Sequence, residues 1–406
     1  MALDEPSAQL HLDLRASVQR ALSSRRPLLH HLNADTSWLL QVLRPESAVR
    51  NGARIYYNIL IDPWLQGGQS DLASWFSQQW HATPSAVPSI AALEELAREM
   101  EILASGLRVG AGRKSNAAME REQDARVETF IDAVAISHEF TDHCHKETLH
   151  DIHPNVPVFA VREAAKLIGS WQHFRTVVTV DEFGQHGNTD WRSSSMAPLP
   201  DWIGISRLLQ KDDVLHYHSA LMIAFNNRHH SSVSNFTSLN KSSSTKRKQH
   251  HFTIEPNEDD ETAEAIIYTP HGIHSGDLTL IPTASPAINT LAFLHGLHNI
   301  RVGTASGRTA LQSNLGAHNG LKAQRLLNAK HWIGTHDEVK KGGGLVAWFL
   351  QRDVITLKEA LDRERELRTD ESGMGATMGG ELGEVLDAFE GTKWADLGNG
   401  ESRVLM

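Results

Sequence analysis

A short apolar stretch that runs directly into a cluster of histidines and acidic residues constrains the fold of this chain most. Residues 131–138 read IDAVAISH, and such an apolar run predicts a buried strand. Asp142 and His143 follow within the next few residues. Because open α/β sheets place functional side chains at the carboxyl ends of their strands, this segment predicts a site at the edge of a sheet.

Strand and helix patterns alternate through most of the chain. Residues 37–45 and 54–65 are apolar and have prolines at or near their ends, so we expect two strands that form a hairpin. Further strands are expected at residues 156–161, 176–183, 213–225, 264–273 and 331–336, and helices at residues 162–171 and 321–331. This order predicts a mixed α/β domain.

The sequence suggests three parts. Residues 1–36 are an N-terminal segment, residues 37–365 form the domain, and residues 366–406 are a polar, glycine-rich tail. Two insertions are expected within the domain. The one at about residues 67–128 contains an amphipathic helix, and the one at about residues 226–262 is rich in serine and charge, which predicts disorder.

Composition limits the classes of function. The single cysteine, Cys144, excludes an intramolecular disulfide and a cysteine-based zinc knuckle. No signal-like or membrane-spanning apolar run is evident, so we expect a cytoplasmic protein, with a nuclear location as the alternative. The net charge of −10 argues against nucleic acid as a partner. A small-molecule substrate is the expected partner, and the oligomeric state stays open.

The cluster after the strand has a pattern that suits a metal ion. Asp142 and His143 offer one oxygen and one imidazole to the same ion, a combination typical of Zn, Mn or Fe sites. The segment ISHEFTDHC resembles the His-x-His-x-Asp-His signature of the metallo-β-lactamase fold superfamily, with His138 as the first histidine. Phe140 stands in place of the second histidine.

Other parts of the chain follow the order that this resemblance implies. Asp62 ends an early strand, His271 occupies the place of an aspartate that bridges metals in many relatives, and His336 ends a late strand. The chain is most similar to the branch with lactonase-like and phospholipase-D-like hydrolases, and especially to fungal members. The implied fold is an αββα sandwich, in which two mixed sheets are flanked by helices.

The resemblance also implies an activity. It predicts a metal-dependent hydrolase that uses a metal-bound hydroxide on an ester, lactone, amide or phosphodiester. Because Phe140 removes one ligand, one ion is expected, with Zn first and Mn or Fe as alternatives. The expected metal ligands are His138, Asp142, His143, His271 and His336, with His218 as an alternative. Asp142 is also expected to act as the catalytic general base, and Asp62 to accept a ring N–H from a ligand.

Other interpretations remain open at this point. The chain could be a non-catalytic binding or scaffold protein that kept the fold after losing part of the metal site. A nuclease of the same fold fits less well, because the incomplete signature and the acidic charge both oppose it. Lys340 could face an anionic substrate near His336, but a solvated turn is the simpler interpretation of its surroundings.

Overall fold

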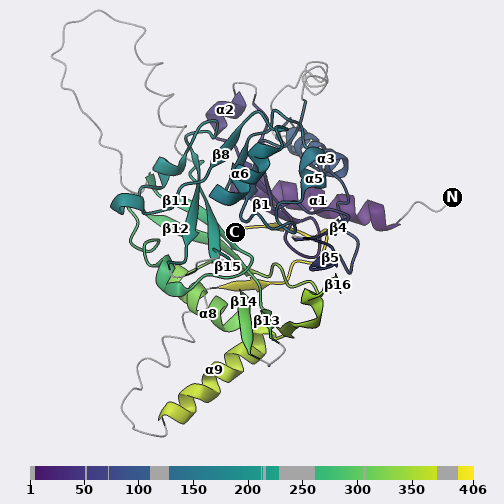
Figure 1. Ribbon diagram of the computed structural model, residues 1–406. Helices are drawn as coiled ribbons and strands as arrows, with labels where there is room; N and C mark the ends of the chain where they lie inside the picture. The colour runs from purple at the N-terminus through teal and green to yellow at the C-terminus, as the bar shows by residue number, and fades with distance from the viewer. Residues whose placement is uncertain are drawn as a thin grey trace, which may run out of the picture.

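Two large mixed β-sheets pack face to face, and helices cover their outer faces (Figure 1). The computed structural model describes residues 5–50, 53–71, 73–109, 128–211, 213, 216–227, 261–304, 308–372 and 392–406. The predicted fold class, a mixed α/β sandwich with two sheets flanked by helices, is confirmed.

The larger sheet combines an antiparallel half with a parallel half. Its strands, in spatial order, are β19 (Ser402–Val404), β1 (Leu28–His31), β2 (Trp38–Leu43), β3 (Tyr56–Ile61), β6 (Ala133–Ile136), β7 (Val158–Ala160) and β8 (Val177–Thr179). The pairs from β19 to β3 are antiparallel, which confirms the predicted hairpin of β2 and β3. The pairs from β3 to β8 are parallel.

The second large sheet is also mixed. Its order is β18 (Lys393–Ala395), β15 (His331–Ile333), β12 (Ile288–His295), β11 (Ala263–Thr269), β10 (Ser219–Phe225) and β9 (Ile203–Leu209). The first four strands are parallel, whereas β10 is antiparallel to both of its neighbours. The carboxyl ends of β11 and β15 therefore lie at the same sheet edge as the start of β10.

Alternation along the strands divides the apolar core into layers. On β11, Ile266 belongs to the core between the two sheets, while Ile267 faces the helices on the other side. The helices of the first sheet are α1 (Glu5–Ser24), α2 (Glu46–Arg50), α3 (Ile90–Val109), α5 (Lys146–His150) and α6 (Arg162–Ser170), and those of the second are α8 (Gly316–Leu327) and α9 (Leu357–Ser372). Short 3₁₀ turns occupy Gln185–Gly187, Trp191–Ser194, Ser275–Leu278 and Val346–Trp348.

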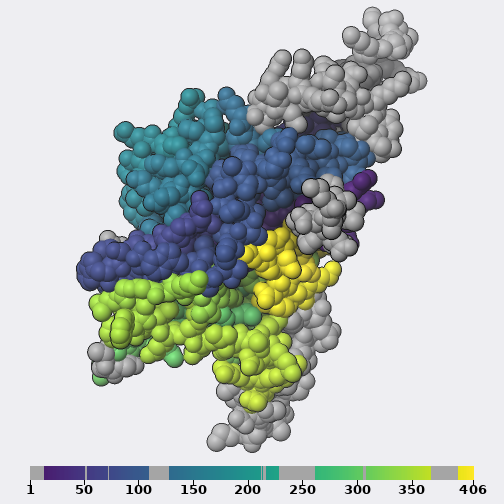
Figure 2. Space-filling model, turned by 90° about the vertical axis from the view of Figure 1, so that its right-hand side faces the viewer, coloured from purple at the N-terminus to yellow at the C-terminus, as the bar shows by residue number. Residues whose placement is uncertain are grey.

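Two three-stranded sheets lie beside the sandwich and were not expected from the sequence. One has the order β14 (Thr309–Leu315), β13 (Asn299–Gly303), β17 (Leu350–Asp353), and the other β16 (Lys341–Gly343), β5 (Gln78–Trp80), β4 (Gly68–Gln69). Figure 2 shows the blue segment around β5 lying directly against the lime segment around β16. These strands escaped prediction because most of them are short, polar or glycine-rich, which hides any regular alternation.

The predicted boundaries of the domain need correction at both ends. The segment before residue 37 contributes β1 to the larger sheet, and the supposed polar tail contributes β18 and β19, one to each large sheet. These strands of three or four residues are too short to give a periodic signal. Residues 228–260, most of the second expected insertion, lie outside the described residues, as do residues 110–127 of the first.

The expected amphipathic helix of the first insertion is α3. It belongs to the body of the fold, because Leu93 and Met100 are fully buried in the apolar core. Within the described ranges, no helix combines the length and the apolar character that a membrane span requires.

Candidate metal centre

The ends of four strands deliver polar side chains to one place between the two large sheets. Asp62 follows β3, His138 follows β6, His271 follows β11 and His336 follows β15. Asp62 and His336 have positive φ angles of 41° and 60°, a conformation that non-glycine residues adopt rarely. Residues held in such sparsely populated conformations recur at functional sites, where the surrounding structure maintains them.

His143 is held in one orientation by Asp62. The Nδ1 atom of His143 lies 2.7 Å from Asp62 Oδ2, and both side chains are fully buried. Because a carboxylate only accepts, the imidazole donates through Nδ1 and directs Nε2 toward the centre. Burial lowers the pKa of His143, but the nearby Asp142 carboxylate and the bond to Asp62 outweigh it and raise the pKa above its usual value.

His336 is held in the same way by a residue that the sequence did not single out. Its Nδ1 atom lies 3.1 Å from Asp35 Oδ1, and its backbone N–H donates to the Asp35 carbonyl. Asp35 is fully buried and lies in the turn between β1 and β2, where an aspartate looks like an ordinary turn residue. Burial lowers the pKa of His336, so a neutral ring presents its Nε2 lone pair to the centre.

Asp142 lies between these two imidazoles. Its Oδ1 is 3.6 Å from His143 Nε2 and its Oδ2 is 3.9 Å from His336 Nε2. Burial alone would raise the pKa of this carboxyl, but the ammonium of Lys340 and the neighbouring histidines hold it well below its usual range. Asp142 is therefore an ionised acceptor at neutral pH.

Lys340 reaches into the centre, which corrects the expectation of a solvated turn. Its Nζ lies 2.7 Å from Asp35 Oδ2 and 2.9 Å from Asp142 Oδ2, and the side chain is only 6% exposed. Two buried carboxylates and the ring of Trp64, whose centroid is 5.2 Å away, stabilise this ammonium. Lys341, in contrast, is exposed.

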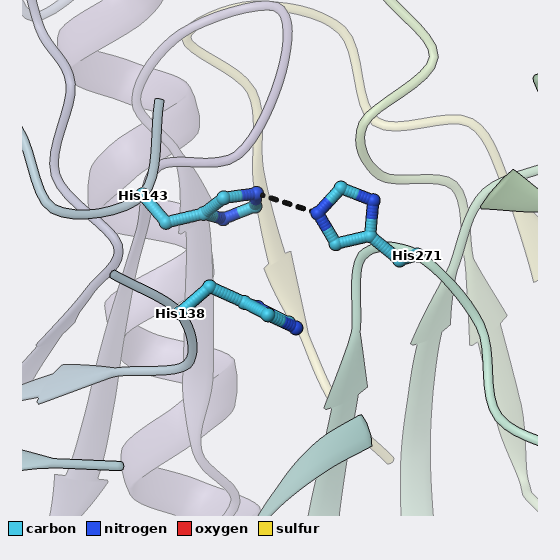
Figure 3. Close-up of side chains that lie close together, drawn as sticks. All are labelled: His138, His143 and His271. Atoms are coloured by element: carbon cyan, nitrogen blue, oxygen red, sulfur yellow. Dashed lines mark hydrogen bonds between the residues drawn. The ribbon is translucent and has the colours of Figure 1, made fainter. Parts of the chain in front are cut away.

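Two groups of side chains at this centre have ligand atoms within 4.8 Å of one another. One group is Asp142, His143 and His336, and the other is His138, His143 and His271. Figure 3 shows the second group, with the ring of His271 pointing at that of His143. His143 belongs to both groups, so its single Nε2 can serve only one ion at a time.

A proton lies between the Nε2 atoms of His143 and His271, at the place where an ion would bind. Their Nε2 atoms are 3.1 Å apart, while each Nδ1 faces an acceptor, Asp62 Oδ2 or Asn314 Oδ1. One ring must therefore donate through Nε2. Burial keeps the pKa of His271 well below its usual value, so the donor is His143. A divalent ion that displaced this proton would find two imidazole lone pairs.

His138 lies close to the centre but has other partners. Its Nε2 is 2.8 Å from the carbonyl oxygen of Tyr217, and its Nδ1 is 2.8 Å from Ser137 Oγ. Since a carbonyl only accepts, the neutral ring donates through Nε2 and keeps no lone pair there. Phe140, which stands in the signature in place of a histidine, stacks on Tyr217 with ring centroids 4.5 Å apart.

Two further candidates from the sequence lie outside these groups. His218 is buried beside Asp213, with Nδ1 3.2 Å from its carboxylate, and it joins neither group of converging ligand atoms among the described residues. Cys144 is 1% exposed, and burial raises the pKa of its thiol, so it is an inert core residue.

The residues present fit a metal ion. Asp142, His143 and His336 would supply one oxygen and two nitrogens, and each imidazole has its other nitrogen fixed by a buried carboxylate. Such carboxylate–imidazole pairs orient metal-binding histidines in many proteins. A three-residue set of this kind leaves a coordination position open for water or substrate.

The centre opens into a cavity of about 700 Å³, including its mouth. Asp142, His271, His336 and Lys340 lie along its inner part. Residues from the first expected insertion, Gln69, Asp71, Ser77 and Gln79, form one side, and the sheet β14-β13-β17 forms another. Desolvation and the nearby Asp142 raise the pKa of Asp71.

Comparisons with known proteins give distant likenesses only. No family model matches the chain, and no curated protein matches it. Among solved structures, an isothiocyanate hydrolase from Delia radicum gut bacteria is 12% identical with a TM-score of 0.46, over 93% of this chain and 99% of the other. A possible metal-dependent hydrolase from Veillonella parvula DSM 2008 is 9% identical, with a TM-score of 0.46, over 94% and 100%.

A third similar structure is the metallo-β-lactamase fold protein YhfI from Bacillus subtilis. It is 9% identical with a TM-score of 0.38, and the match covers 93% of this chain and 99% of that protein. The expected affinity to the lactonase-like branch and to fungal members stays a prediction.

Proposed function

We propose that this protein is a metal-dependent hydrolase that holds one ion with Asp142, His143 and His336. One observation carries the proposal: the two imidazoles have their Nδ1 atoms fixed by buried Asp62 and Asp35, and their Nε2 atoms converge with the Asp142 carboxylate. Two nitrogens and one oxygen suit Zn best, with Mn or Fe as alternatives. Such an ion supplies a coordinated water with a pKa of about 7 and polarises a carbonyl or phosphoryl oxygen.

The residues of the chain have separate roles in this proposal. Asp62 and Asp35 hold the imidazole rings, and Lys340 keeps Asp142 ionised and in place. Asp142 acts as the carboxylate ligand. The expectation that it also serves as general base would require one of its oxygens to leave Lys340. His271 is a fourth ligand or a proton acceptor, because its Nε2 faces that of His143.

A single ion follows from the sharing of His143. Because both groups of ligand atoms use its one Nε2, filling one group leaves the other incomplete. His138 would also have to give up the Tyr217 carbonyl before it could bind through Nε2. The substrates proposed are small esters, lactones, amides or phosphodiesters, and an intracellular, cytoplasmic setting accompanies the single buried cysteine.

A non-catalytic binding protein is the second candidate, and one observation favours it. The ammonium of Lys340 already neutralises part of the charge of Asp35 and Asp142, so the centre has a cation of its own. A protein that needs no ion would keep its fold and its ligand site after exhaustive removal of metals.

Metal analysis decides between these two functions. We expect the purified protein to contain about one equivalent of a transition metal, and the double variant Asp142→Ala/His143→Ala to contain none. The two proteins should then be assayed against ester, lactone, thioester and phosphodiester probes with added Zn or Mn. The variant Asp132→Asn is a matched control, since this carboxylate pairs with Arg44 and Arg54 far from the centre. A folded wild-type protein without bound metal would overturn the hydrolase proposal.

A further inference from the structure

One side of the cavity is a continuous wall made by the sheet β14-β13-β17. Side chains alternate along a strand, so every second residue faces the cavity. The residues of these strands that line the cavity are Ile300, Val302, Leu311, Ser313, Asn314, Leu350 and Arg352, and the adjacent pair Ser313 and Asn314 lies beside an irregularity in the pairing with Ile300. Val302 pairs across the strands with both Leu311 and Leu350, so three apolar side chains lie side by side.

Arg352 is the charged member of this wall. It pairs with Ile300 across the strands, and its Nη1 lies 2.8 Å from His298 Nδ1 and 3.4 Å from the carbonyl of Asp337. A guanidinium has five N–H donors, and these contacts use only those of one nitrogen. Within the described part of the chain, no carboxylate forms an ion pair with Arg352, whereas Lys340 in the same cavity is paired with Asp35 and Asp142.

The charge and the apolar surface occupy different places along this wall. Arg352 contacts the backbone of Asp337, the residue after His336, and therefore lies toward the candidate metal centre. Leu350 lies two residues earlier on the same strand and beside Val302, toward the turn of Val346–Trp348. A molecule lying along the wall would meet a cation next to the metal ligands and apolar side chains beyond it.

We propose that this wall binds the substrate and selects amphipathic anions. A carboxylate or phosphate group accepts hydrogen bonds from Arg352, and an aliphatic or aromatic part lies against Val302, Leu311 and Leu350. Guanidinium is well suited to this task, because its planar array of donors matches both anions. The inference rests on the proposed hydrolase function only in that the bound molecule is called a substrate. The binding itself requires neither metal nor turnover.

Binding of simple amphiphiles tests the wall directly. Calorimetric titrations should compare butanoate, hexanoate and octanoate, then octyl phosphate and octanol, on the protein as purified. We expect affinity to rise by about fourfold for each methylene that the wall covers. Octanol, which lacks the charge, should bind at least about tenfold more weakly than octanoate. Comparison of octanoate with octyl phosphate shows whether the site prefers a carboxylate or a phosphate.

Arg352→Met should weaken octanoate binding by at least about tenfold. The matched control is Arg301→Met, which removes the same charge from the opposite face of the same sheet, where Arg301 is bonded to Gln351. Arg301→Met should bind octanoate like the wild type. Val302→Ser should reduce the gain in affinity per methylene while leaving butanoate binding unchanged.

Arg352→Lys keeps the positive charge but not the planar array of donors, so it should bind octanoate more weakly than the wild type and more tightly than Arg352→Met, which separates loss of charge from loss of fold. Equal octanoate binding by wild type and Arg352→Met, or an affinity independent of chain length, would overturn the inference. A metal-free protein that binds octanoate through Arg352 would overturn the hydrolase proposal while leaving the anion site in place.

Discussion

Two sets of buried histidines differ in what holds their ring nitrogens. His143 and His336, at the candidate metal centre, each bond a buried carboxylate through Nδ1 and keep Nε2 directed at the centre. His30 and His295, inside the two large sheets, bond only neutral groups such as Gln41 and Asn319. Burial is nearly complete in both sets, so burial does not distinguish a candidate ligand from a structural histidine.

The chemistry of the partner separates these two sets, although a carboxylate partner alone does not make a ligand, since His218 has one and lies outside both groups. A carboxylate behind an imidazole fixes its tautomer and increases its basicity, and both effects favour a metal at the opposite nitrogen. A neutral partner completes the hydrogen bonds of the ring but does not increase its basicity. His138 lies among the first set but has the partners of the second, the Tyr217 carbonyl and the Ser137 hydroxyl. Variants can therefore test whether position or partner decides the role of a histidine.

The largest effect is expected for His143→Ala. This imidazole belongs to both groups of converging ligand atoms, so its loss leaves neither group complete. Loss of a residue that only orients a metal ligand lowers metal affinity by up to about 100-fold. Loss of the ligand His143 itself should therefore lower metal affinity by at least about 100-fold. Metal content measured by mass spectrometry after dialysis checks this. His30→Ala is the matched loss of a buried imidazole and should keep its metal, and equal metal loss in both variants would contradict the comparison.

Asp35→Asn should have the next largest effect. The amide still fills the space beside His336, but it no longer provides a negative charge behind the ring. Metal affinity should fall by about 10- to 100-fold, and Asp62→Asn should act similarly through His143. Competition with a chromogenic chelator measures both affinities. An unchanged affinity in Asp35→Asn would mean that His336 is not a ligand.

The two histidines with neutral partners, His30 and His295, should make the free energy of unfolding depend on pH. Burial lowers the pKa of His30 and of His295 to about 4 from the ordinary histidine value of 6.5. Below pH 6.5 the unfolded chain therefore binds protons that the folded protein does not bind, so the free energy of unfolding falls as the pH drops toward 4. Each ring should cost about 2 kcal/mol of unfolding free energy at a pH of about 5.

Urea unfolding of the wild type and of His30→Gln/His295→Gln at neutral and acidic pH measures this cost. The glutamines cannot titrate, so the double variant should lose less stability between the two pH values than the wild type does. The same pH dependence in both proteins would show that these rings are not the neutral, buried groups described here.

The smallest effect is expected for His138→Gln. Its Nε2 already donates to the Tyr217 carbonyl, so removing the ring should change metal affinity by less than about threefold. Chelator competition again measures the value. A tenfold loss would place His138 with the ligands and would favour the group of His138, His143 and His271 over the group that contains Asp142.

Local patterns in the sequence predicted much of the fold. Apolar runs located the hairpin of β2 and β3, and helical spacing located α3, α6 and α8. The same patterns located Asp62, Asp142, His143, His271 and His336 at or near strand ends, where the structure brings them together. The edge strands β18 and β19 were missed, because three-residue strands gain their stability from the neighbouring strand rather than from their own pattern.

The sequence by itself located the apolar strands β2, β3, β6, β7, β8, β10, β11 and β15, but not β9 or β12. It also predicted that a pair such as Asp142 and His143 would follow the end of a strand. Only the tertiary structure decided which other side chains meet them. Asp35, Lys340 and Arg352 come from polar turns or a short strand far apart in the chain, and no local pattern marks them. Their positions follow from how the sheets and loops pack, because contacts between distant segments depend on the whole fold and leave no trace in local residue spacing.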